Sequence, residues 1–495
     1  MKRLIVIVFI IFGAFLTLCL YRTFAYDTSV VEEVPSTTDL EYTFKIGNSS
    51  IKQITVDSGE TRYYDIVLGN PNNAKISYSI YYEMVSPTTK PDGFSIGYTS
   101  KSTGTSTGKV DKNGNITLSI EASNTSSSAV TVKIGTVAGY VNGGELTLGS
   151  GQVIIPKVSV NAVELITKLN DDTSGDSGSG VYKVTHSAIP ASSSATGSEI
   201  PAVTDYRYYG PSPNNYICLD MEGGSTCPDK HLYRIIGSIY EEKENTNRIK
   251  VIKATPLTDG TTKDFSWDYK VNNGSGSYDN IWATITSGNY SNSLSSGSTL
   301  MQLLNSGAWW NGTSGSYYNG YTTATNVNFT NYKLSDKAKS YITTSRYYLG
   351  GYNNSNGVMT NQFYAYERGT TRYDTNRPLY WDGMVGLMYP SDFGYAAGNS
   401  CVTGTDPYNY NAVGGCKNKD WLWMTTSSDY TNGAEWLMSP YSGNSDYVFD
   451  VFSSGYVNRN NNSHNVYSAR PVFYLNSSAS ITDGEGTSTD PYILS

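Results

Sequence analysis

Apolar and polar residues alternate with a period of two along short runs between Tyr42 and Val160, and turn residues separate the runs. A period of two places the apolar side chains on one face of a β-strand, so each run predicts a half-buried strand. The runs are Tyr42–Ile46, Ile51–Val56, Tyr63–Leu68, Ile76–Tyr82, Ile116–Ile120, Val130–Val137 and Gln152–Ile155. This spacing predicts an all-β immunoglobulin-like sandwich over residues 27–165. Sandwiches of this kind in surface proteins usually serve as spacers.

A segment of small polar residues follows the sandwich. Residues 171–180 read DDTSGDSGSG, and residues 191–197 are similar in composition. Such a composition is typical of a flexible linker, which we expect to cover residues 166–204, so that the two flanking domains fold independently. Asp171, Asp172 and Asp176 suggest calcium, but they lack the spacing and the bidentate Glu of a calcium loop, so a solvated linker is the preferred interpretation.

Residues 205–495 combine predicted strands, short helices and long loops. Strands are expected at Tyr216–Leu219, Leu232–Tyr240 and Arg248–Lys253, and helices at Ser298–Asn305 and Asp336–Thr343. The mixture indicates a larger, loop-rich α+β domain.

The last sixty residues contain further strand patterns around Tyr447–Val451 and Val472–Leu475. Between them, residues 458–465 are so polar that they predict a surface loop. Trp436 and Arg470 flank this region and are predicted to be structural, because Trp buries a large apolar area and Arg can donate to several carbonyl groups.

Several segments carry a resemblance: Trp-Leu-x-Ser-Pro at 436–440, Ala-Arg-Pro-Val-x-Tyr-Leu at 469–475 and Gly-x-Gly-Thr-x-x-x-Pro-Tyr at 484–492. Together with segments at 206–210, 232–237 and 386–389, they resemble a domain of uncharacterised surface proteins from Gram-positive bacteria and their wall-less relatives. That domain is related to the formylglycine-generating-enzyme-like branch of the C-type lectin fold. The resemblance covers roughly residues 205–495 and implies a C-type-lectin-like domain and a surface location. It implies no activity.

The N-terminus resembles an export signal. Lys2 and Arg3 precede the apolar run Leu4–Leu20, and cleavage after Ala25 would leave small residues at the usual positions. The run also reaches the lower limit for a membrane span, so residues 1–25 are either a signal peptide or an anchor attached through residues 4–20. Cys19 resembles a lipoprotein site, but Leu18 occupies a position that requires a small residue.

Four cysteines lie beyond this leader: Cys218, Cys227, Cys401 and Cys416. An even number in an exported chain predicts two disulfides. Cys218–Cys227 with Cys401–Cys416 is the simplest of the three possible pairings. The spacing of a thiolate metal site is absent, so we predict no metal and no cofactor.

The formal net charge is −8, and charged residues make up only 16% of the chain, whereas Tyr occurs 43 times. An acidic protein repels nucleic acid and anionic lipid, which argues against both as partners. Hydroxyl, amide and aromatic side chains then dominate the surface. This composition suits a secreted adhesin or carbohydrate-binding protein, and equally an extracellular scaffold that avoids charge.

Catalytic patterns are weak. The three histidines, His186, His231 and His464, fall in the predicted linker, at a strand edge and in the polar loop. No nucleophile elbow, metalloprotease motif or phosphate loop occurs. Glu367, Asp374 and Asp382 are candidates for a glycosidase carboxylate pair, but their spacing does not favour that role over solvation. We therefore expect no enzyme activity, and the cysteines are better explained as disulfides than as an oxidase site.

Binding is better supported, because Tyr and Asn side chains provide contact area and adaptable hydrogen bonds. The predicted contact residues are Tyr456, Asn458, Asn460, Asn461, His464 and Tyr467, and a plain solvated turn is the alternative. A second aromatic cluster contains Trp309, Trp310, Tyr317, Tyr318 and Tyr321, with one of the two tryptophans expected in the core. We expect an exported bacterial surface protein that binds a glycan, or a host or bacterial surface protein, without catalysis. The alternatives are a purely structural envelope protein, or a hydrolase or oxidase.

Overall fold

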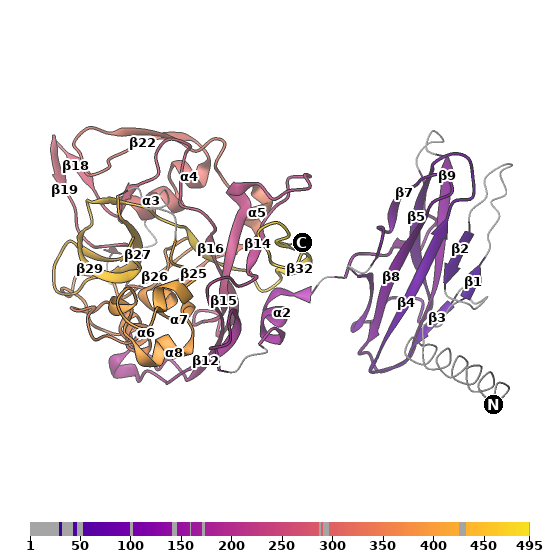
Figure 1. Ribbon diagram of the computed structural model, residues 1–495, viewed down its shortest axis with the longest axis horizontal. Coiled ribbons are helices and arrows are strands. Elements are labelled where there is room, and N and C mark those ends of the chain that lie inside the picture. Colours follow the sequence, from indigo (N-terminus) through magenta and orange to yellow (C-terminus); the bar gives the residue numbers. More distant parts are fainter. Residues whose placement is uncertain are drawn as a thin grey trace, which may run out of the picture. The chain divides into compact units, whose positions relative to one another are not determined.

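The computed structural model describes residues 29–31, 43–46, 53–99, 102–140, 146–158, 160–170, 174–286, 289–290, 297–424 and 432–494. The chain divides into two compact units, Met1–Ser159 and Val160–Ser495. Both units are rich in β-strand, as the alternating sequence predicts for the N-terminal one (Figure 1). The predicted leader lies outside the described residues, and so do Asp171 and Asp172.

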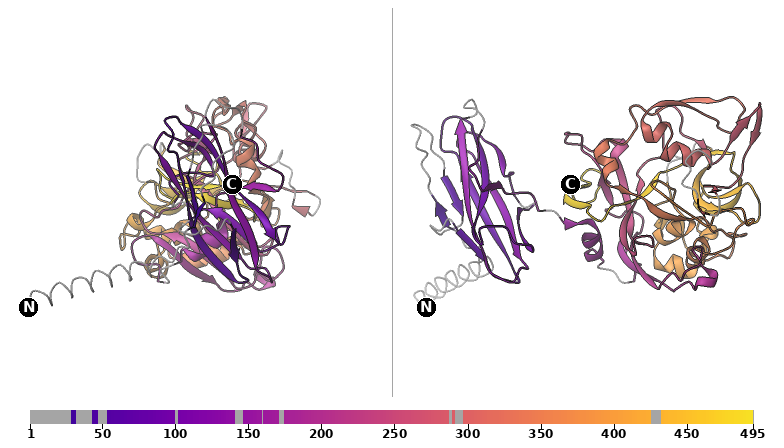
Figure 2. Two further views of the ribbon diagram at one scale, coloured as in Figure 1. Left: turned by 90° about the vertical axis from the view of Figure 1, so that its right-hand side faces the viewer. Right: turned by 180° about the vertical axis from the view of Figure 1, so that it is seen from behind.

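The N-terminal unit consists of two antiparallel sheets, whose strands are drawn from two further directions in Figure 2. Its strands are β1 Ser29–Val31, β2 Thr43–Ile46, β3 Gln53–Val56, β4 Glu60–Gly69, β5 Ile76–Ser86, β6 Phe94–Tyr98, β7 Thr107–Val110, β8 Asn115–Asn124, β9 Val130–Tyr140 and β10 Gln152–Ile154. One sheet has the order β1-β2-β4-β8-β6, and the other has the order β10-β5-β9-β3 with β7 paired to β5. All seven predicted runs coincide with strands.

Alternation also determines what these sheets bury. Along β8 the exposed and buried side chains alternate residue by residue. Ile66 and Leu118 from one sheet share an apolar core with Ile80 and Val132 from the other, and all four are completely buried. The two sheets therefore form a sandwich, as the sequence predicts.

The C-terminal unit contains many short elements. Its strands are β11 Val160–Asn161, β12 Gly180–His186, β13 Val203–Tyr209, β14 Tyr216–Cys218, β15 Leu232–Glu241, β16 Thr246–Lys253, β17 Phe265–Ser266, β18 Lys270–Asn272, β19 Ser275–Ser277, β20 Ile285–Thr286, β21 Asn289–Tyr290, β22 Ser314–Tyr317, β23 Thr325–Asn328, β24 Ile342–Thr343, β25 Ser345–Tyr348, β26 Tyr380–Gly383, β27 Ala434–Pro440, β28 Tyr447–Phe452, β29 Tyr456–Asn462, β30 Val466–Tyr467, β31 Val472–Leu475, β32 Ser480–Asp483 and β33 Tyr492–Leu494. Its helices are α2 Ala162–Lys168, α3 Thr299–Asn305, α4 Ala308–Asn311, α5 Asp336–Ser340, α6 Thr360–Glu367, α7 Pro390–Ala396 and α8 Asn399–Gly404, with 3₁₀ turns η1 Ala191–Ser193, η2 Asp229–His231, η3 Pro407–Asn409 and η4 Cys416–Lys419.

A ten-stranded sheet organises this unit. Its order is β11-β32-β33-β14-β15-β16-β31-β24, and β13 joins β12 to β15. The strands pair antiparallel except for β14 and β33, which run parallel. This pairing attaches the C-terminal strand beside Cys218, so the last residues of the chain belong to the main sheet.

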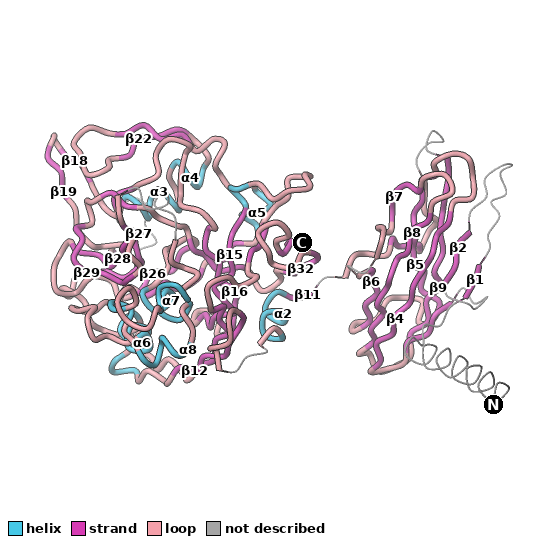
Figure 3. The backbone as a smooth tube through the Cα atoms, in the orientation of Figure 1, coloured by secondary structure: helices cyan, strands magenta, loops and turns pink. Residues whose placement is uncertain are grey.

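The helices are short, and α3 and α5 begin at serine caps. Ser298 accepts a hydrogen bond from the backbone of α3, and Ser335 does the same for α5, which satisfies otherwise unpaired N–H groups. Both helices were predicted, although Ile342 lies in β24 rather than in α5. Helices α6, α7 and α8, which were not predicted, pack together (Figure 3).

The predicted linker is wrong over its described residues. The sequence Gly180–His186 forms β12, which pairs along its whole length with β13, and Val181, Tyr182 and Val184 are buried. Asp176 accepts a hydrogen bond from the Ser400 backbone. The domain boundaries at 165 and 205 therefore shift to Ser159/Val160, and residues 174–204 are part of the second unit.

Among the described residues, none of the helices has the length and apolar content needed to cross a membrane.

Candidate functional site

The predicted contact segment is largely a strand rather than a loop. Tyr456–Asn462 forms β29 and pairs antiparallel with β28, so the surface-loop prediction is wrong for residues 458–462. The polar residues Asn458 and Asn461 fit into a strand because their side-chain amides have a buried hydrogen-bond partner. The side chain of Asn460 lies outside the described residues.

That partner is Asp450, which is completely buried in β28. The side-chain amide of Asn461 donates to the Asp450 carboxylate at 2.7–2.8 Å, and the amide of Asn458 donates at 3.0–3.1 Å. Burial raises the pKa of Asp450 to about 7, although both amides oppose the shift. Tyr467 donates its hydroxyl to the Asn461 side-chain oxygen at 3.0 Å. Asn458, Asn461 and Tyr467 therefore have structural partners, which leaves less of the segment for a ligand.

The other end of the segment meets exposed aromatic rings. The imidazole of His464 lies 4.1 Å from the ring of Tyr278, centroid to centroid, and Tyr278 is 39% exposed. Gly320, which lies between Tyr318 and Tyr321, is close to the His464 carbonyl, because a Cβ added to it would lie 2.6 Å from the carbonyl oxygen. The chain that carries the second aromatic cluster therefore lies against this end of the segment. Tyr456 packs edge-on against Tyr408 at 5.5 Å.

The second aromatic cluster divides between core and surface. Trp309 and Tyr317 are buried, whereas Trp310 is half-buried with the Lys339 ammonium 5.0 Å from its ring. One tryptophan is therefore in the core, as predicted. Tyr318 is partly exposed and Tyr321 is 69% exposed.

A groove of about 600 Å³ lies beside this cluster, between helices α3 and α4 and strand β22. Its lining residues are Thr299, Gln302, Leu303, Ser306, Gly307, Ala308, Asn311, Thr313, Ser314, Gly315, Ser316, Tyr317 and Tyr318. The polar side chains of this lining are hydroxyls, amides and tyrosines, and Leu303 and Ala308 add apolar surface. The described lining holds no carboxylate, imidazole, thiol or amine. The groove was not predicted, but the hydroxyl and amide residues interspersed between Trp309-Trp310 and Tyr317-Tyr318 could have indicated it.

Two amides of the groove are held in place by the backbone. Gln302 donates to the Gly297 carbonyl at 2.8 Å, and Asn311 donates to the Ser306 carbonyl at 2.6 Å. A fixed side chain loses less entropy when a ligand binds, so these groups are pre-organised for recognition.

A second set of polar groups is buried around Asp392 of α7. Arg207 donates to Asp205 at 2.8 Å and to Asp392 at 3.0 Å, and the Lys250 ammonium lies 2.5 Å from the other Asp392 oxygen. His186, predicted in the linker, bonds Asp205 at 2.9 Å and stacks on Tyr364. Burial lowers the pKa of His186, and Asp205 only partly offsets the effect. Each of these buried charges lies beside an opposite charge, which offsets the free-energy cost of burying it. The ion pairs therefore link segments that are far apart in the sequence.

The three candidate carboxylates have separate partners. Glu367 is buried and accepts from Ser391 at 2.6 Å, and burial raises its pKa to about 7. Asp382 accepts two hydrogen bonds from Arg346, and Asp374 accepts from the backbone of Asn376. These contacts account for each group structurally and do not indicate a glycosidase pair.

Trp436 and Arg470 are both buried. The Trp436 indole donates to the Phe265 carbonyl at 2.8 Å. Arg470 forms a two-pronged pair with Glu435 at 2.6 and 2.9 Å and donates to the Leu422 carbonyl at 2.7 Å. The structural roles expected for them remain predictions.

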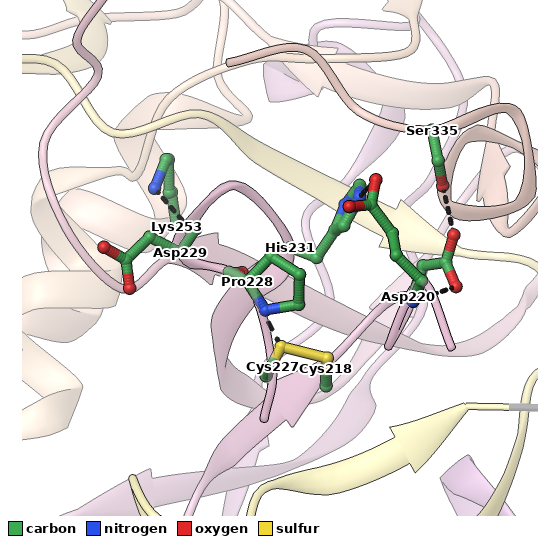
Figure 4. Close-up of a disulfide and its surroundings, with 9 residues drawn as sticks. Cys218, Asp220, Cys227, Pro228, Asp229, His231, Lys253 and Ser335 are labelled. Atoms are coloured by element: carbon green, nitrogen blue, oxygen red, sulfur yellow. Dashed lines mark hydrogen bonds and ion pairs between the residues drawn. A yellow bond between two sulfur atoms is a disulfide. The ribbon is translucent and has the colours of Figure 1, made fainter. Parts of the chain in front are cut away.

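The cysteines pair as Cys218–Cys227 and Cys401–Cys416, which confirms the predicted disulfides. Beside the first disulfide, Asp220 and His231 lie close together with Glu222 (Figure 4). The ligand atoms of these three residues are within 4.8 Å of one another. The sequence analysis missed this group, although two acids spaced two apart in a cysteine-closed loop beside a histidine were the available signal.

Comparison with known proteins gives no assignment: no family model, no curated protein and no solved structure matches this chain.

Proposed function

We propose that the C-terminal unit binds an uncharged glycan in the groove between α3, α4 and β22, without catalysis. The observation that supports this most strongly is the chemistry of the lining, in which amides, hydroxyls and Tyr318 surround a groove of about 600 Å³. Its volume lies within the usual range for small-ligand sites.

The lining matches sugar chemistry in two respects. Sugar hydroxyls both donate and accept hydrogen bonds, and so do the side chains of Gln302, Asn311 and Thr313. Tyrosine offers an apolar ring face and a polar tip, which suits the mixed surface of a sugar ring. Glycoside hydrolysis requires a pair of carboxylates, and the described lining contains none.

The remaining parts of the proposal concern architecture and location. We propose an immunoglobulin-like spacer for the N-terminal unit and a C-type-lectin-like fold for the C-terminal unit. The first is supported by two antiparallel sheets around one core, and the second by the motif resemblance. The two disulfides support export to the cell surface, because such bonds persist in oxidising compartments.

The test is a glycan array probed with the secreted protein, followed by titration of the best sugar. Tyr318→Ala is expected to weaken binding by about tenfold, as expected for loss of an aromatic contact worth more than 1 kcal/mol. Tyr332→Ala is the matched control, because Tyr332 lines the neighbouring groove on the other side of β22. Equal affinities for the two variants would place the sugar elsewhere.

The other outcomes distinguish the alternatives. Release of free sugar during the titration would show a hydrolase. A protein ligand whose binding falls with Tyr278→Ala and not with Tyr318→Ala would transfer the role to the aromatic rings around His464. Absence of any ligand, with intact folding, would favour a purely structural envelope protein.

A further inference from the structure

Asp220, Glu222 and His231 come from one short stretch that a disulfide closes. Asp220 follows β14 directly, and Cys218–Cys227 joins the ends of the loop that carries both acids. His231 ends the η2 turn just beyond the loop. The disulfide restricts the loop in the unfolded chain and in the folded one, so the three side chains are pre-organised.

Each side chain is directed by specific contacts. One oxygen of Asp220 accepts from the Ser335 hydroxyl at 2.6 Å, and the other accepts from the Glu222 backbone at 3.0 Å (Figure 4). Glu222 has φ = +48°, an unusual backbone conformation for a residue with a side chain. Its carboxylate lies 3.1 Å from Nε2 of His231. A carboxylate has about four lone-pair positions, so both acids retain capacity to bind a cation.

The imidazole of His231 is completely buried, and its Nδ1 has no hydrogen-bond partner among the described residues. Buried polar atoms without partners are uncommon and call for an explanation. The other ring nitrogen, Nε2, faces the Glu222 carboxylate at 3.1 Å. A neutral imidazole can offer a lone pair to a metal.

One cation already faces the cluster. The Lys230 ammonium lies 2.8 Å from Glu222, but the Lys230 side chain is 25% exposed and can turn into solvent. Two carboxylates thus face one ammonium, so Lys230 can pair with only one of them at a time.

We propose that Asp220, Glu222 and His231 form a binding site for a divalent transition metal, with Zn²⁺ as the best fit. Imidazole and carboxylate ligands suit Zn²⁺, which is bound tetrahedrally, and a water molecule supplies the fourth ligand. Ca²⁺ takes six to eight oxygen ligands and Mg²⁺ demands octahedral oxygen coordination, so neither matches a set of three that includes nitrogen. The Lys230 ammonium competes with the metal for Glu222.

The experiment titrates Zn²⁺ into the chelator-treated secreted protein by calorimetry at pH 7, and records the visible spectrum with Co²⁺ in place of Zn²⁺. Glu222→Gln is the main variant, because Glu222 is exposed and its loss does not disturb the core. We expect its dissociation constant to rise by at least about tenfold, since loss of an outer-shell group alone costs about 10- to 100-fold. His231→Gln is expected to abolish the tetrahedral Co²⁺ spectrum.

Two further variants make the test sharper. Asp229→Asn removes a neighbouring carboxylate outside the cluster and should leave the affinity unchanged. Lys230→Ala should tighten binding by up to about fivefold, the equivalent of about 1 kcal/mol for an exposed ion pair. Equal affinity of the wild type and Glu222→Gln, or weaker binding by Lys230→Ala, would overturn the proposal. So would a wild type that binds neither ion.

Discussion

The two units differ in the kind of residue that they bury. In the described part of the N-terminal unit, the buried polar residues are uncharged: Asn70, Ser79, Ser106, Asn124 and Thr136. The C-terminal unit buries several ion pairs, including Arg207 with Asp392 and Arg470 with Glu435. The apolar core of the first tolerates any residue of similar size and hydrophobicity. The charged contacts of the second each require one particular partner, which in the case of Arg207 lies 185 residues away.

This difference explains how irregular chain is held in place. Long loops cannot be positioned by alternation alone, because buried loop backbone and polar groups need hydrogen-bond partners. In the C-terminal unit, buried ion pairs and two disulfides connect distant segments. In the N-terminal unit, the pairing of strands is sufficient to hold the chain in place.

The largest expected effect comes from Arg207→Met, which keeps the volume but removes the charge. Asp205 and Asp392 then lose their shared partner, and loss of one member of a buried ion pair costs about 3–5 kcal/mol. The control Ile66→Met in the N-terminal core should cost less than about 1.5 kcal/mol. Calorimetry of the whole protein measures both. Equal costs for the two variants would show that the cores do not differ in this respect.

The sequence could predict what depends on local pattern. Seven of the N-terminal strands, the helices α3 and α5, and both disulfides followed from periodicity, helix-start signals and cysteine number. Strand β12 was missed because its alternation, with Tyr182, Val184 and His186 buried, is short and lies between Gly- and Ser-rich residues. The linker prediction was based on the amino-acid composition of the residues that flank β12, and it did not take account of the strand itself.

The polar segment after Gly455 was misinterpreted for another reason. Asn458 and Asn461 are polar, but they bind the carboxylate of Asp450, which is eight residues or more away and was not expected to be buried. The cluster of Asp220, Glu222 and His231 depends on a turn whose geometry is not encoded in any short motif. Pairings between polar residues are specified by the folded geometry, so the sequence analysis identified neither the groove nor this cluster.

The second prediction concerns pH. The pKa of Asp450 is about 7 in the folded protein, above its ordinary value of 3.8. A raised pKa means that this group's contribution to stability is complete below about pH 4 and is lost as the pH rises through 7. Asn mimics the protonated carboxyl, so Asp450→Asn should gain stability relative to the wild type over this range, by up to about 4 kcal/mol. Urea unfolding between pH 4 and 8 measures the difference.

As a control, we expect Asp450→Asn to leave the unfolding transition of the N-terminal unit unchanged at every pH. The described part of that unit buries no carboxylate or histidine. A difference between Asp450→Asn and the wild type that stays constant with pH would contradict the raised pKa.

The third prediction uses the disulfides, both of which lie in the C-terminal unit. Replacing Cys218 and Cys227 by Ala should lower the stability of that unit by about 3 kcal/mol, because the reduced chain gains loop entropy when it unfolds. Reductant should shift the C-terminal transition and leave the N-terminal one in place. Thiol labelling of the denatured wild type should find none of these four cysteines reactive, and labelling of any of them would contradict the pairing.

The smallest effect separates two residues of the same segment. Asn461→Ala leaves the buried Asp450 with one amide donor fewer, which costs about 1–3 kcal/mol. His464 is only partly buried and packs against the exposed Tyr278, so His464→Ala should change stability by no more than about 0.5 kcal/mol. Melting curves of the two single variants test this, with Tyr321→Ala as a fully surface control. A His464 variant that unfolds as readily as the Asn461 variant would mean that this end of the segment, too, belongs to the framework. A stable His464 variant would leave the Tyr278–His464 face available for contact with a partner.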